Sequence, residues 1–409
     1  MRSPSKMQVP IESAHVVVLT NYLRRHHVLV FEEIKKRVGK LTVLLSTEME
    51  PDRDWQAEWG SLDVVLQKSW MYTAKWKHSA GFNESNFIHV PMDTVSQLKS
   101  LKPDAVFSYE MGIRTFLSGR YCRKAKIPLV MVGNMIDHVE HERGVLRRAL
   151  RRMIVQSIDY ATYNGPGCQR YLRSLNIPDE RLFHFPYAMD PEKVSVGPKD
   201  FSQGEERRLL FCGALGERKG IVNFLKVLKR YATAIPMAKI RLSIAGDGPL
   251  RDQVAEMAQS NLAIEFLGNC NPEQLRQAYH DTDICVFPTL ADEWGLVPIE
   301  AMKSGIPVLG SVSAQSIETF CVDGENGWVF DPQDPESIYK SIEQAFATKP
   351  QQLKEMGEVA RAAVQHISAG YSADEFMKIL SFTSAPDLHS DQQPIESLIY
   401  TTTEQSIAR

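Results

Sequence analysis

The chain has 409 residues, 43% of them hydrophobic and 24% charged, with a formal net charge of −3. This composition is ordinary for a soluble globular protein, and the length allows two α/β domains of roughly 180 to 200 residues each. No stretch approaches the ~18 consecutive apolar residues of a membrane span, and the first residues do not resemble a signal peptide. The six cysteines are scattered without a CxxC pair, which favours reduced thiols over disulfides or a metal site and predicts a cytoplasmic protein.

The charge is divided unevenly between the two halves of the chain. Residues 1–200 hold 29 Lys and Arg against 22 Asp and Glu, a net charge of +7, while residues 201–409 carry a net charge of −10. The positive excess predicts that the first half meets an anionic partner. A second interpretation is that the surface charge of two domains simply differs.

Predicted strands and helices alternate along the first half of the chain. Apolar runs at 15–20, 41–45, 105–108 and 127–132 predict strands, and the pattern of 28–38 predicts a helix between the first two. Such alternation is typical of a parallel sheet covered by helices.

The second half repeats this alternation in a doubly wound pattern, which places a ligand site at the carboxyl ends of the strands. Residues after 384 are polar and aperiodic, and they predict a mobile tail. The predicted strands are 208–213, 240–246, 263–268, 284–287 and 306–309, and the predicted helices are 220–232, 250–260, 272–279, 335–347, 353–366 and 373–380.

Two acids, Asp292 and Glu300, lie eight positions apart in the segment 288–310, PTLADEWGLVPIEAMKSGIPVLG. Asp292 is in a loop that follows the buried strand 284–287. Pro298 suits the first turn of a helix, and Gly305 suits its end. Backbone N–H groups at this helix N-terminus, between the two acids, suit an anionic phosphate.

Two further loops carry residues of interest at the same edge of the predicted sheet. Arg218 and Lys219 in FCGALGERKG follow strand 208–213, where two cations suit a diphosphate; the alternative is a solvated loop. Gly246 and Gly248 in AGDGPL permit a tight turn and a close backbone approach, in a pattern that is also a common turn.

The segment DEWGLVPIEAMKSG resembles the acid, seven residues, acid signature of retaining glycosyltransferases of the GT-B fold, the large family four, usually written like EGFGLPVLEAMACG. The resemblance covers most of residues 15–380 and is strongest over 208–332. It implies two Rossmann-like doubly wound domains that face each other across a cleft. The implied units are an acceptor-binding domain (1–190), a nucleotide-sugar domain (191–365), a closing helix that returns to the first domain (366–384) and the tail (385–409).

The resemblance also implies roles for individual residues on the donor side. A nucleotide diphosphate sugar is the implied donor substrate, with no metal and no further cofactor. Asp292 is expected to face the donor sugar, and Glu300 is expected to bind the ribose. Two departures from the family pattern are Asp292, one methylene shorter than the usual Glu, and Ala214, which replaces the usual Arg. Arg218 and Lys219 are expected to contact the diphosphate. Gly268 and Asn269 are expected to contact the base. The remaining expected contacts with the donor are made by the backbone of Gly213, Gly246, Trp294, Gly295, Leu296 and Val297.

The acceptor side is less defined by the sequence. Family members often keep a polar residue after the strand at 127–132, and here Asn134, Asp137 and His138 are equal candidates for a catalytic role. The glycine-rich loop that the family often has after its first strand is absent at Asn21. The pair His26-His27 has no metal partners at readable spacing and is predicted to lie on the surface.

Residues 143–154, RGVLRRALRRMI, place arginines on helical stripes beside apolar residues. Such a helix suits the anionic inner face of a membrane, and it equally suits packing on the domain with its arginines exposed. The predicted function is transfer of a hexose-type sugar to a glycan, lipid-linked or small-molecule acceptor, with no nucleic-acid partner. The alternatives are a non-catalytic nucleotide-sugar-binding scaffold and a sugar-nucleotide epimerase of similar fold.

Overall fold

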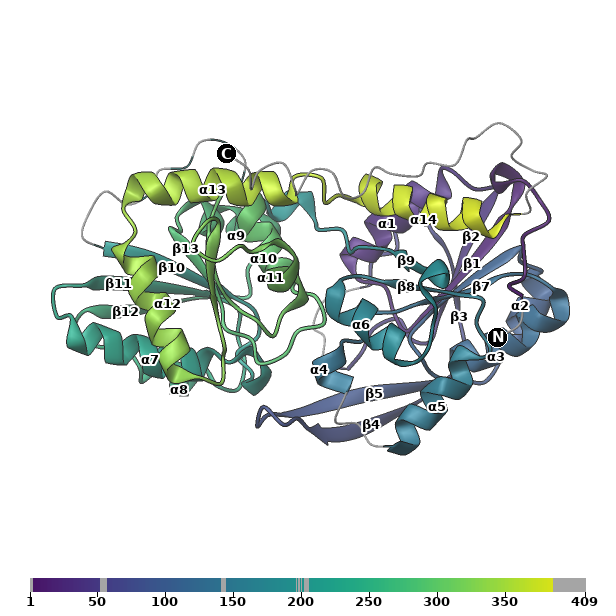
Figure 1. The fold of residues 1–409 in the computed structure, drawn as a ribbon, viewed down its shortest axis with the longest axis horizontal. Coiled ribbons are helices and arrows are strands. Elements are labelled where there is room, and N and C mark those ends of the chain that lie inside the picture. Colours follow the sequence, from purple (N-terminus) through teal and green to yellow (C-terminus); the bar gives the residue numbers. More distant parts are fainter. Residues whose placement is uncertain are drawn as a thin grey trace.

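The computed structural model describes residues 3–51, 57–140, 145–195, 197, 199, 201 and 206–384. Two α/β units lie side by side, each with a parallel sheet between layers of helices (Figure 1). We call the unit around the first sheet the first domain and the unit around the second sheet the second domain. The predicted tail, 385–409, lies outside the described residues.

The first domain is built on a seven-stranded parallel sheet of order β3-β2-β1-β6-β7-β8-β9. Central strands such as β1 and β6 are buried along almost their whole length, because helices cover both faces of the sheet. The strands are β1 (His15–Thr20), β2 (Lys40–Leu45), β3 (Asp63–Leu66), β6 (Ala105–Tyr109), β7 (Leu129–Val132), β8 (Tyr160–Tyr163) and β9 (Leu182–His184), and the helices are α1 (Arg25–Lys35), α2 (Thr94–Leu101), α3 (Ile113–Ala125), α4 (Asp137–Glu140), α5 (Val145–Val155) and α6 (Pro166–Ser174).

The second domain is built on a six-stranded parallel sheet of order β12-β11-β10-β13-β14-β15. Its strands are β10 (Glu206–Cys212), β11 (Lys239–Ala245), β12 (Leu262–Gly268), β13 (Ile284–Phe287), β14 (Val308–Ser311) and β15 (Gly327–Phe330). Its helices are α7 (Ile221–Ala234), α8 (Arg251–Ala255), α9 (Pro272–His280), α10 (Leu296–Lys303), α11 (Gln315–Phe320), α12 (Pro335–Ala347) and α13 (Pro350–Val364). Helix α8 ends at Ala255, shorter than the predicted 250–260, because the chain turns back and Gln259 pairs with Leu262 at the start of β12.

Each sheet reverses its strand order at one point. In the first sheet β1 lies between β2 and β6, and in the second β10 lies between β11 and β13. Loops on either side of such a switch point diverge at the carboxyl ends of the strands and leave room for a ligand. A ligand site is therefore expected at the loops that follow β1, β10 and β13.

The last helix, α14 (Ala369–Thr383), leaves the second domain and packs against α1 of the first (Figure 1). Phe376 on this helix is buried and stacks on Phe107 of β6 with ring centroids 4.1 Å apart. At the chain's other end, Met7 donates its N–H to the carbonyl of Thr383. The final segment thus completes the core of the first domain.

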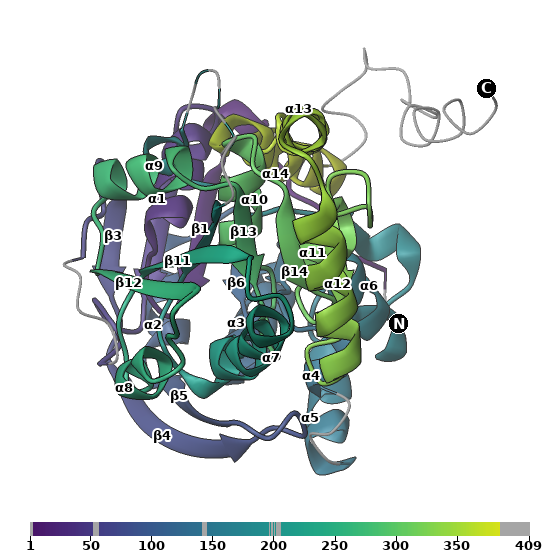
Figure 2. The ribbon, with the colours of Figure 1, turned by 90° about the vertical axis from the view of Figure 1, so that its left-hand side faces the viewer.

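A two-stranded antiparallel hairpin, β4 (Ser69–Lys77) and β5 (Asn83–Pro91), lies outside both sheets. Figure 2 shows it curving along the lower edge of the molecule, where α5 also lies. Its tip reaches the second domain: Phe82 is buried against Leu290 and Ala291, and the N–H of Asn83 donates to Glu217 at 3.0 Å. The hairpin therefore connects the two domains beside the loop after β13.

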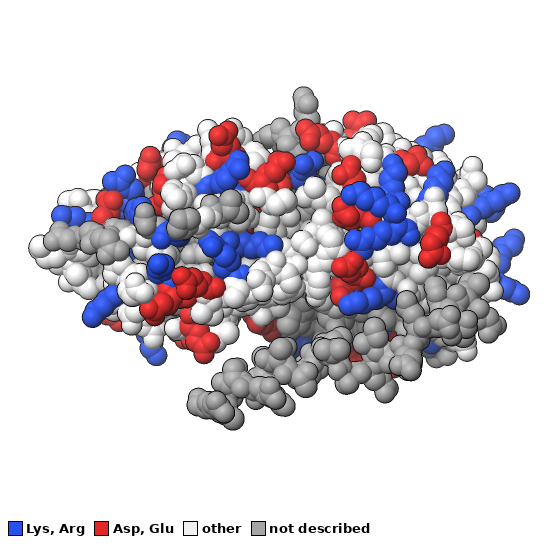
Figure 3. Space-filling view, turned by 90° about the horizontal axis from the view of Figure 1, so that it is seen from above, with Lys and Arg blue, Asp and Glu red and all other residues white. Residues whose placement is uncertain are grey.

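The charge asymmetry between the halves does not produce a patch of one sign on the upper face. There, basic and acidic side chains are interspersed over the described part of both domains (Figure 3). In the described part of the chain, none of the helices is long and apolar enough to cross a membrane.

Candidate functional site

Three glycines bring the carboxyl ends of β10, β11 and β12 close together. The N–H of Gly213 donates to the carbonyl of Ala245 at 2.9 Å, and the N–H of Gly246 donates to the carbonyl of Gly268 at 2.7 Å. A Cβ on Gly246, whose φ is +143°, would lie 2.1 Å from the carbonyl oxygen of Gly213. Glycine is therefore required at Gly246 for this approach, as the sequence predicts.

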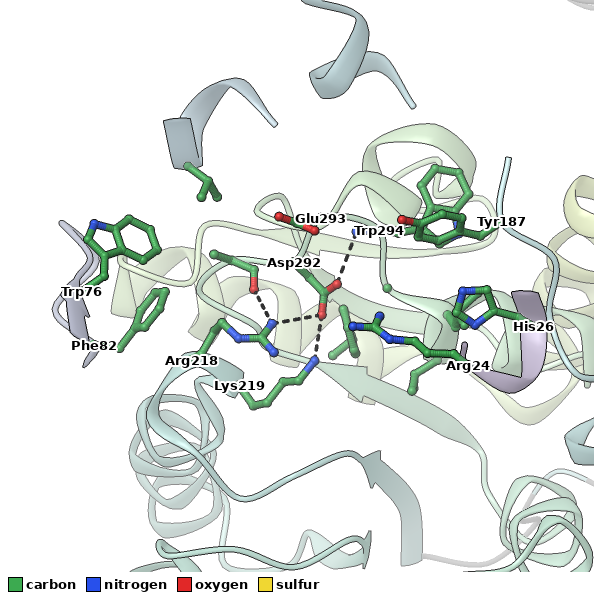
Figure 4. Close-up of a pocket in the computed structure, with 16 residues that line it drawn as sticks. Arg24, His26, Trp76, Phe82, Tyr187, Arg218, Lys219, Asp292, Glu293 and Trp294 are labelled. Carbon is green, nitrogen blue, oxygen red and sulfur yellow. Dashed lines mark hydrogen bonds and ion pairs between the residues drawn. The ribbon is translucent and has the colours of Figure 1, made fainter. Parts of the chain in front are cut away.

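The cations after β10 meet the acid after β13. Lys219 Nζ lies 2.7 Å from Asp292 Oδ2, and Arg218 Nη1 lies 3.5 Å from the same oxygen (Figure 4). The backbone N–H of Trp294 donates to the other carboxylate oxygen at 3.3 Å. Two loops at the switch point of the second sheet thus converge on one carboxylate.

This convergence sets the protonation of the group. Burial alone would raise the pKa of Asp292, but the charges of Lys219 and Arg218 lower it to about 2. Burial lowers the pKa of Lys219, and the adjacent Asp292 opposes that change. Asp292 is therefore an anion at neutral pH, matched by cations that a phosphate group can also attract.

A cavity of about 290 Å³ opens beside this cluster, between the two domains. The predicted residues that line it all belong to the second domain, and they come from the loop after β10, the loop after β13 and the start of α10. They are Arg218, Lys219, Asp292, Trp294, Gly295, Leu296 and Val297.

The other donor-side candidates lie away from the cavity wall. Glu300 is 3% exposed, accepts a hydrogen bond from the hydroxyl of Tyr279 at 3.0 Å, and lies 3.8 Å from Lys193 Nζ. Burial raises the pKa of Glu300, and Lys193 opposes the change. Gly213, Gly246, Gly268 and Asn269 also do not line the cavity; Asn269 is exposed beyond the end of β12.

Of the three first-domain candidates, only Asn134 reaches a residue of the cavity wall. Its side-chain amide donates to Glu293 Oε2 at 3.0 Å. Asp137 pairs instead with Arg170 at 2.6 Å, and Arg170 also pairs with Glu318 of the second domain. His138 has a 40% exposed side chain next to Asp137. Asp137 therefore takes part in an ion-pair bridge between the domains.

The cavity also contains residues that the sequence did not single out. Arg24, His26 and Tyr187 line one side, and Trp76 and Phe82 of the hairpin line another (Figure 4). The prediction that His26 lies on the surface is wrong, because it is 7% exposed and packs against Tyr187. The carboxyl-edge rule that located Lys219, applied to the loop after β1, would have found Arg24 and His26.

Glu293, next to Asp292, is another residue of the cavity wall without a predicted role. Enclosure in the cleft raises the pKa of its carboxyl, and the charge of Arg24 opposes that change. Its backbone carbonyl accepts a hydrogen bond from the side chain of Asn164 at 3.1 Å. Asn134 and Asn164 thus tie this loop of the second domain to the first domain.

The basic helix α5 is partly structural. Arg151 is 6% exposed, donates to the carbonyl of Met111 at 3.1 Å and pairs with Glu140 at 3.1 Å, so its predicted place on an exposed basic stripe is wrong. Arg148 and Arg152 are exposed, and so are the apolar side chains of Leu150 and Met153 on the same helix. Arg143 lies outside the described residues.

Within the part of the chain that the structure describes, no group of three or more His, Cys, Asp or Glu side chains is arranged to hold a metal ion.

Comparison with known families finds a match in the second domain. Residues 198–363 match the model of the family "Glycosyl transferases group 1". An uncharacterized glycosyltransferase of Methanocaldococcus jannaschii is 27% identical over 159 residues, which are 38% of this chain and 40% of that protein. A D-inositol 3-phosphate glycosyltransferase of Corynebacterium urealyticum is 27% identical over 266 residues, 60% of this chain and 61% of that protein. The chain thus spans less than two thirds of the length of these curated relatives.

Solved structures share the fold of the whole described chain. Sucrose-phosphate synthase of Thermosynechococcus elongatus superposes with a TM-score of 0.66 at 14% identity, over 90% of this chain and 98% of that one. The Anabaena protein HepE, in complex with UDP-glucose, gives a TM-score of 0.65 at 16% identity, over 90% and 100% of the two chains. The predicted fold class, two Rossmann-like domains in the GT-B arrangement, is confirmed.

Proposed function

We propose that the protein is a retaining, metal-independent hexosyltransferase that uses a nucleotide diphosphate sugar, on the premise that residues 198–363 match the family model of the glycosyl transferases of group 1. The observation that carries the proposal is the meeting of Arg218, Lys219 and Asp292 at the switch point of the second sheet. Side chains at such a point are placed to meet a ligand from both diverging loops.

In this proposal the donor's diphosphate replaces Asp292 as the partner of Lys219. Charge-assisted hydrogen bonds from Lys219 and Arg218 to phosphate oxygens would neutralise the leaving group without a metal ion. The carboxylate of Asp292, released from Lys219, would then accept a hydrogen bond from a donor-sugar hydroxyl. Glu300, which is buried on α10 eight residues further along the chain, would bind the ribose in place of its present contact with Lys193.

The proposed chemistry is a front-face displacement. The bond between the anomeric carbon and the phosphate oxygen breaks, and the acceptor oxygen forms its bond on the same face of the sugar. The leaving phosphate takes the acceptor's proton, so that no protein base is consumed. The cations beside Asp292 support this step because they stabilise the negative charge that develops on the leaving oxygen.

The test is a hydrolysis and transfer assay with UDP-, GDP- and ADP-hexoses, with the anomer of the first-formed product determined by NMR. We expect turnover with one nucleotide class and retention of the donor's anomeric configuration. Inverted product would contradict the proposed mechanism. Nucleotide binding without turnover would favour the scaffold alternative. The specific observation behind this alternative is the acid at Asp292, which is shorter than the usual Glu.

The acceptor is proposed to be lipid-linked and reached from a membrane surface. One face of the hairpin exposes Trp70, Tyr72 and Ile88, with side chains 61%, 54% and 50% exposed; the register pairs Tyr72 with Ile88. Aromatic and aliphatic side chains near exposed arginines suit an anionic bilayer surface. Arg148 and Arg152 are exposed on α5, and this helix lies along the same lower edge of the molecule as the hairpin (Figure 2).

Flotation with phosphatidylcholine vesicles, with and without phosphatidylglycerol, tests this acceptor proposal. We expect binding to anionic vesicles at low salt and loss of binding in the double variant Arg148→Gln, Arg152→Gln, because each charge contributes about 1 kcal/mol near the surface. The double variant Arg120→Gln, Lys124→Gln removes the same charge from α3 and serves as the control. Equal loss in both variants, or no flotation of the parent, would remove the membrane from the proposal.

A further inference from the structure

The tip of the hairpin belongs to the first domain, yet it contacts two loops of the second. Phe82 is 1% exposed and packs with Leu290 and Ala291, which lie in the loop after β13. The backbone N–H of Asn83 donates to Glu217 Oε2 at 3.0 Å, and Glu217 lies in the loop after β10. The first domain therefore reaches both loops that meet at the proposed donor site.

The segment that Phe82 covers also holds Arg218. The N–H of Leu290 donates to the carbonyl of Arg218 at 2.8 Å, and Arg218 Nη1 donates to the carbonyl of Ala291 at 3.0 Å. The hydroxyl of Thr289 donates to the carbonyl of Arg218 at 3.2 Å. Both the backbone and the guanidinium group of Arg218 are thus attached to this segment, so its position sets the direction of the guanidinium group.

Phe82 offers little surface of its own to a ligand. It lines the cavity on the side of Arg218 (Figure 4), but it is buried almost completely. Its ring stacks on His78 with ring centroids 4.5 Å apart, and Ile136 and Val139 of the first domain complete the apolar cluster around it. A ring enclosed in this way has a fixed position, because a shift would lose packing contacts on several sides.

We propose that Phe82 and Asn83 are positioning residues of the diphosphate site, because they fix the loops that direct the guanidinium group of Arg218. The proposal rests on the proposed transferase function. It adds that the affinity of the second domain for a diphosphate depends on contact with the first domain. A charged hydrogen bond to phosphate is directional, and a donor group that is already held in the bonding geometry loses less entropy on binding.

A double-mutant cycle between Phe82 and Arg218 tests this role. A competition assay measures the affinity for whichever of UDP, GDP or ADP binds, in the parent, Phe82→Ala, Arg218→Gln and the double variant. We expect Phe82→Ala to weaken diphosphate binding about tenfold in the parent and less than about twofold in Arg218→Gln, because the hairpin acts through that arginine. Equal losses in both backgrounds would show that Phe82 supports only the fold, and would overturn the proposal.

The matched control is Phe87→Ala. Phe87 belongs to β5 of the same hairpin, but it lies outside the apolar cluster around Phe82 and does not line the cavity. Removal of this ring should leave the diphosphate affinity within about twofold of the parent. Phe82→Leu keeps an apolar side chain against Leu290, so it should retain most of the affinity that Phe82→Ala loses.

A second pair of variants leaves the packing of Phe82 intact. Glu217→Gln and Glu217→Ala both remove a negative charge next to Arg218, but only Gln keeps an oxygen that can accept the hydrogen bond from Asn83. Diphosphate affinity should therefore be about threefold higher in Glu217→Gln than in Glu217→Ala. Equal affinities in the two variants would contradict the role of Asn83.

The parent protein separates this proposal from the function on which it rests. Binding of a nucleoside diphosphate to the parent, without coupling between Phe82 and Arg218, would overturn the positioning role and leave the transferase proposal intact. Failure of UDP, GDP and ADP to bind the parent would overturn the transferase proposal, and the positioning role with it.

Discussion

Lys219 and Asp292, 73 positions apart in the chain, form an ion pair of 2.7 Å that joins the loop after β10 to the loop after β13. Both side chains are largely shielded from water, with 18% and 16% of their side-chain surfaces exposed. A ligand phosphate must compete with this carboxylate for the lysine. The pair therefore fixes the two loops relative to each other. Donor binding must break the ion pair, which lowers the net free energy gained on binding.

Replacement of Lys219 by Ala should weaken nucleoside diphosphate binding by about one to two decades, because a charged hydrogen bond to phosphate contributes about 1.5–3 kcal/mol. Calorimetry with UDP, GDP and ADP measures the loss. Lys226→Ala, an exposed lysine on α7, is the control and should change nothing. Unaltered affinity in Lys219→Ala would remove this residue from the donor site.

Asp292→Ala should reduce turnover at least a hundredfold, equivalent to about 2.7 kcal/mol of activation free energy. Nucleotide affinity should stay the same or increase, because Lys219 loses its competing carboxylate. Steady-state kinetics and calorimetry on the same preparation separate the two effects. Asp292→Glu restores the acid usual in the family, and it should retain activity if the loop accommodates the extra methylene. Full activity of purified Asp292→Ala would end the catalytic assignment.

Glu300→Gln should impair ribose recognition, because an ionised acceptor of hydrogen bonds becomes a neutral amide. The loss of affinity should be larger for the ribonucleotide than for its 2′,3′-dideoxy analogue, and a competition assay with both compounds measures the difference. Tyr279→Phe removes the hydroxyl that now donates to Glu300 and serves as a second probe. Equal losses on both nucleotides would show that Glu300 acts through the fold alone.

The raised pKa of Glu293 predicts a pH dependence of stability. A carboxyl whose pKa is higher in the folded state stabilises the fold while it is protonated, and this contribution is lost as pH rises from the unfolded value through the folded one. Glu293→Gln mimics the protonated form, so the fall in melting temperature between pH 5 and pH 8 should be smaller in the variant. Because Glu293 keeps contact with solvent, we expect a modest effect. Glu265→Gln, exposed on β12, should leave the parent's pH dependence unchanged.

Phe376→Ala should destabilise the first domain by about 3–5 kcal/mol, because the lost ring leaves a cavity against Phe107 and Phe185. Urea unfolding followed by circular dichroism measures the change. Phe382→Ala on the same helix, where the side chain is 47% exposed, should cost much less. Comparable losses in both variants would mean that α14 contributes to the core through its backbone placement only.

The second domain follows closely from local sequence signals. Strand β13 and helix α12 have the bounds that the sequence predicts. Pro288 follows the apolar run of β13, and α12 begins at Pro335 directly after its N-cap, Asp334. The position of Lys219 and Asp292 at one sheet edge follows from the doubly wound pattern alone. The resemblance of this region to family four is confirmed by the match over residues 198–363.

The hairpin and the first-domain wall of the cavity could not be predicted in the same way. Strand β4 mixes polar and aromatic residues without the apolar run of a buried strand, and its tip gains its position from Leu290, more than 200 residues later in the chain. His26 looks like a surface residue until Tyr187, from the linker between the domains, covers it. Contacts between the domains depend on how the domains face each other, and no local sequence pattern encodes that arrangement.

The return of α14 to the first domain has a consequence for how the protein is made. Ala373, Phe376, Ile379 and Leu380 belong to the same apolar core as β1 and α1, yet the ribosome adds them after the whole of the second sheet. The first domain therefore emerges without part of its core and cannot reach full stability until α14 has been synthesised. The second domain, whose own core ends at Ile367 just after α13, can fold earlier, so the order of folding should reverse the order of the domains along the chain.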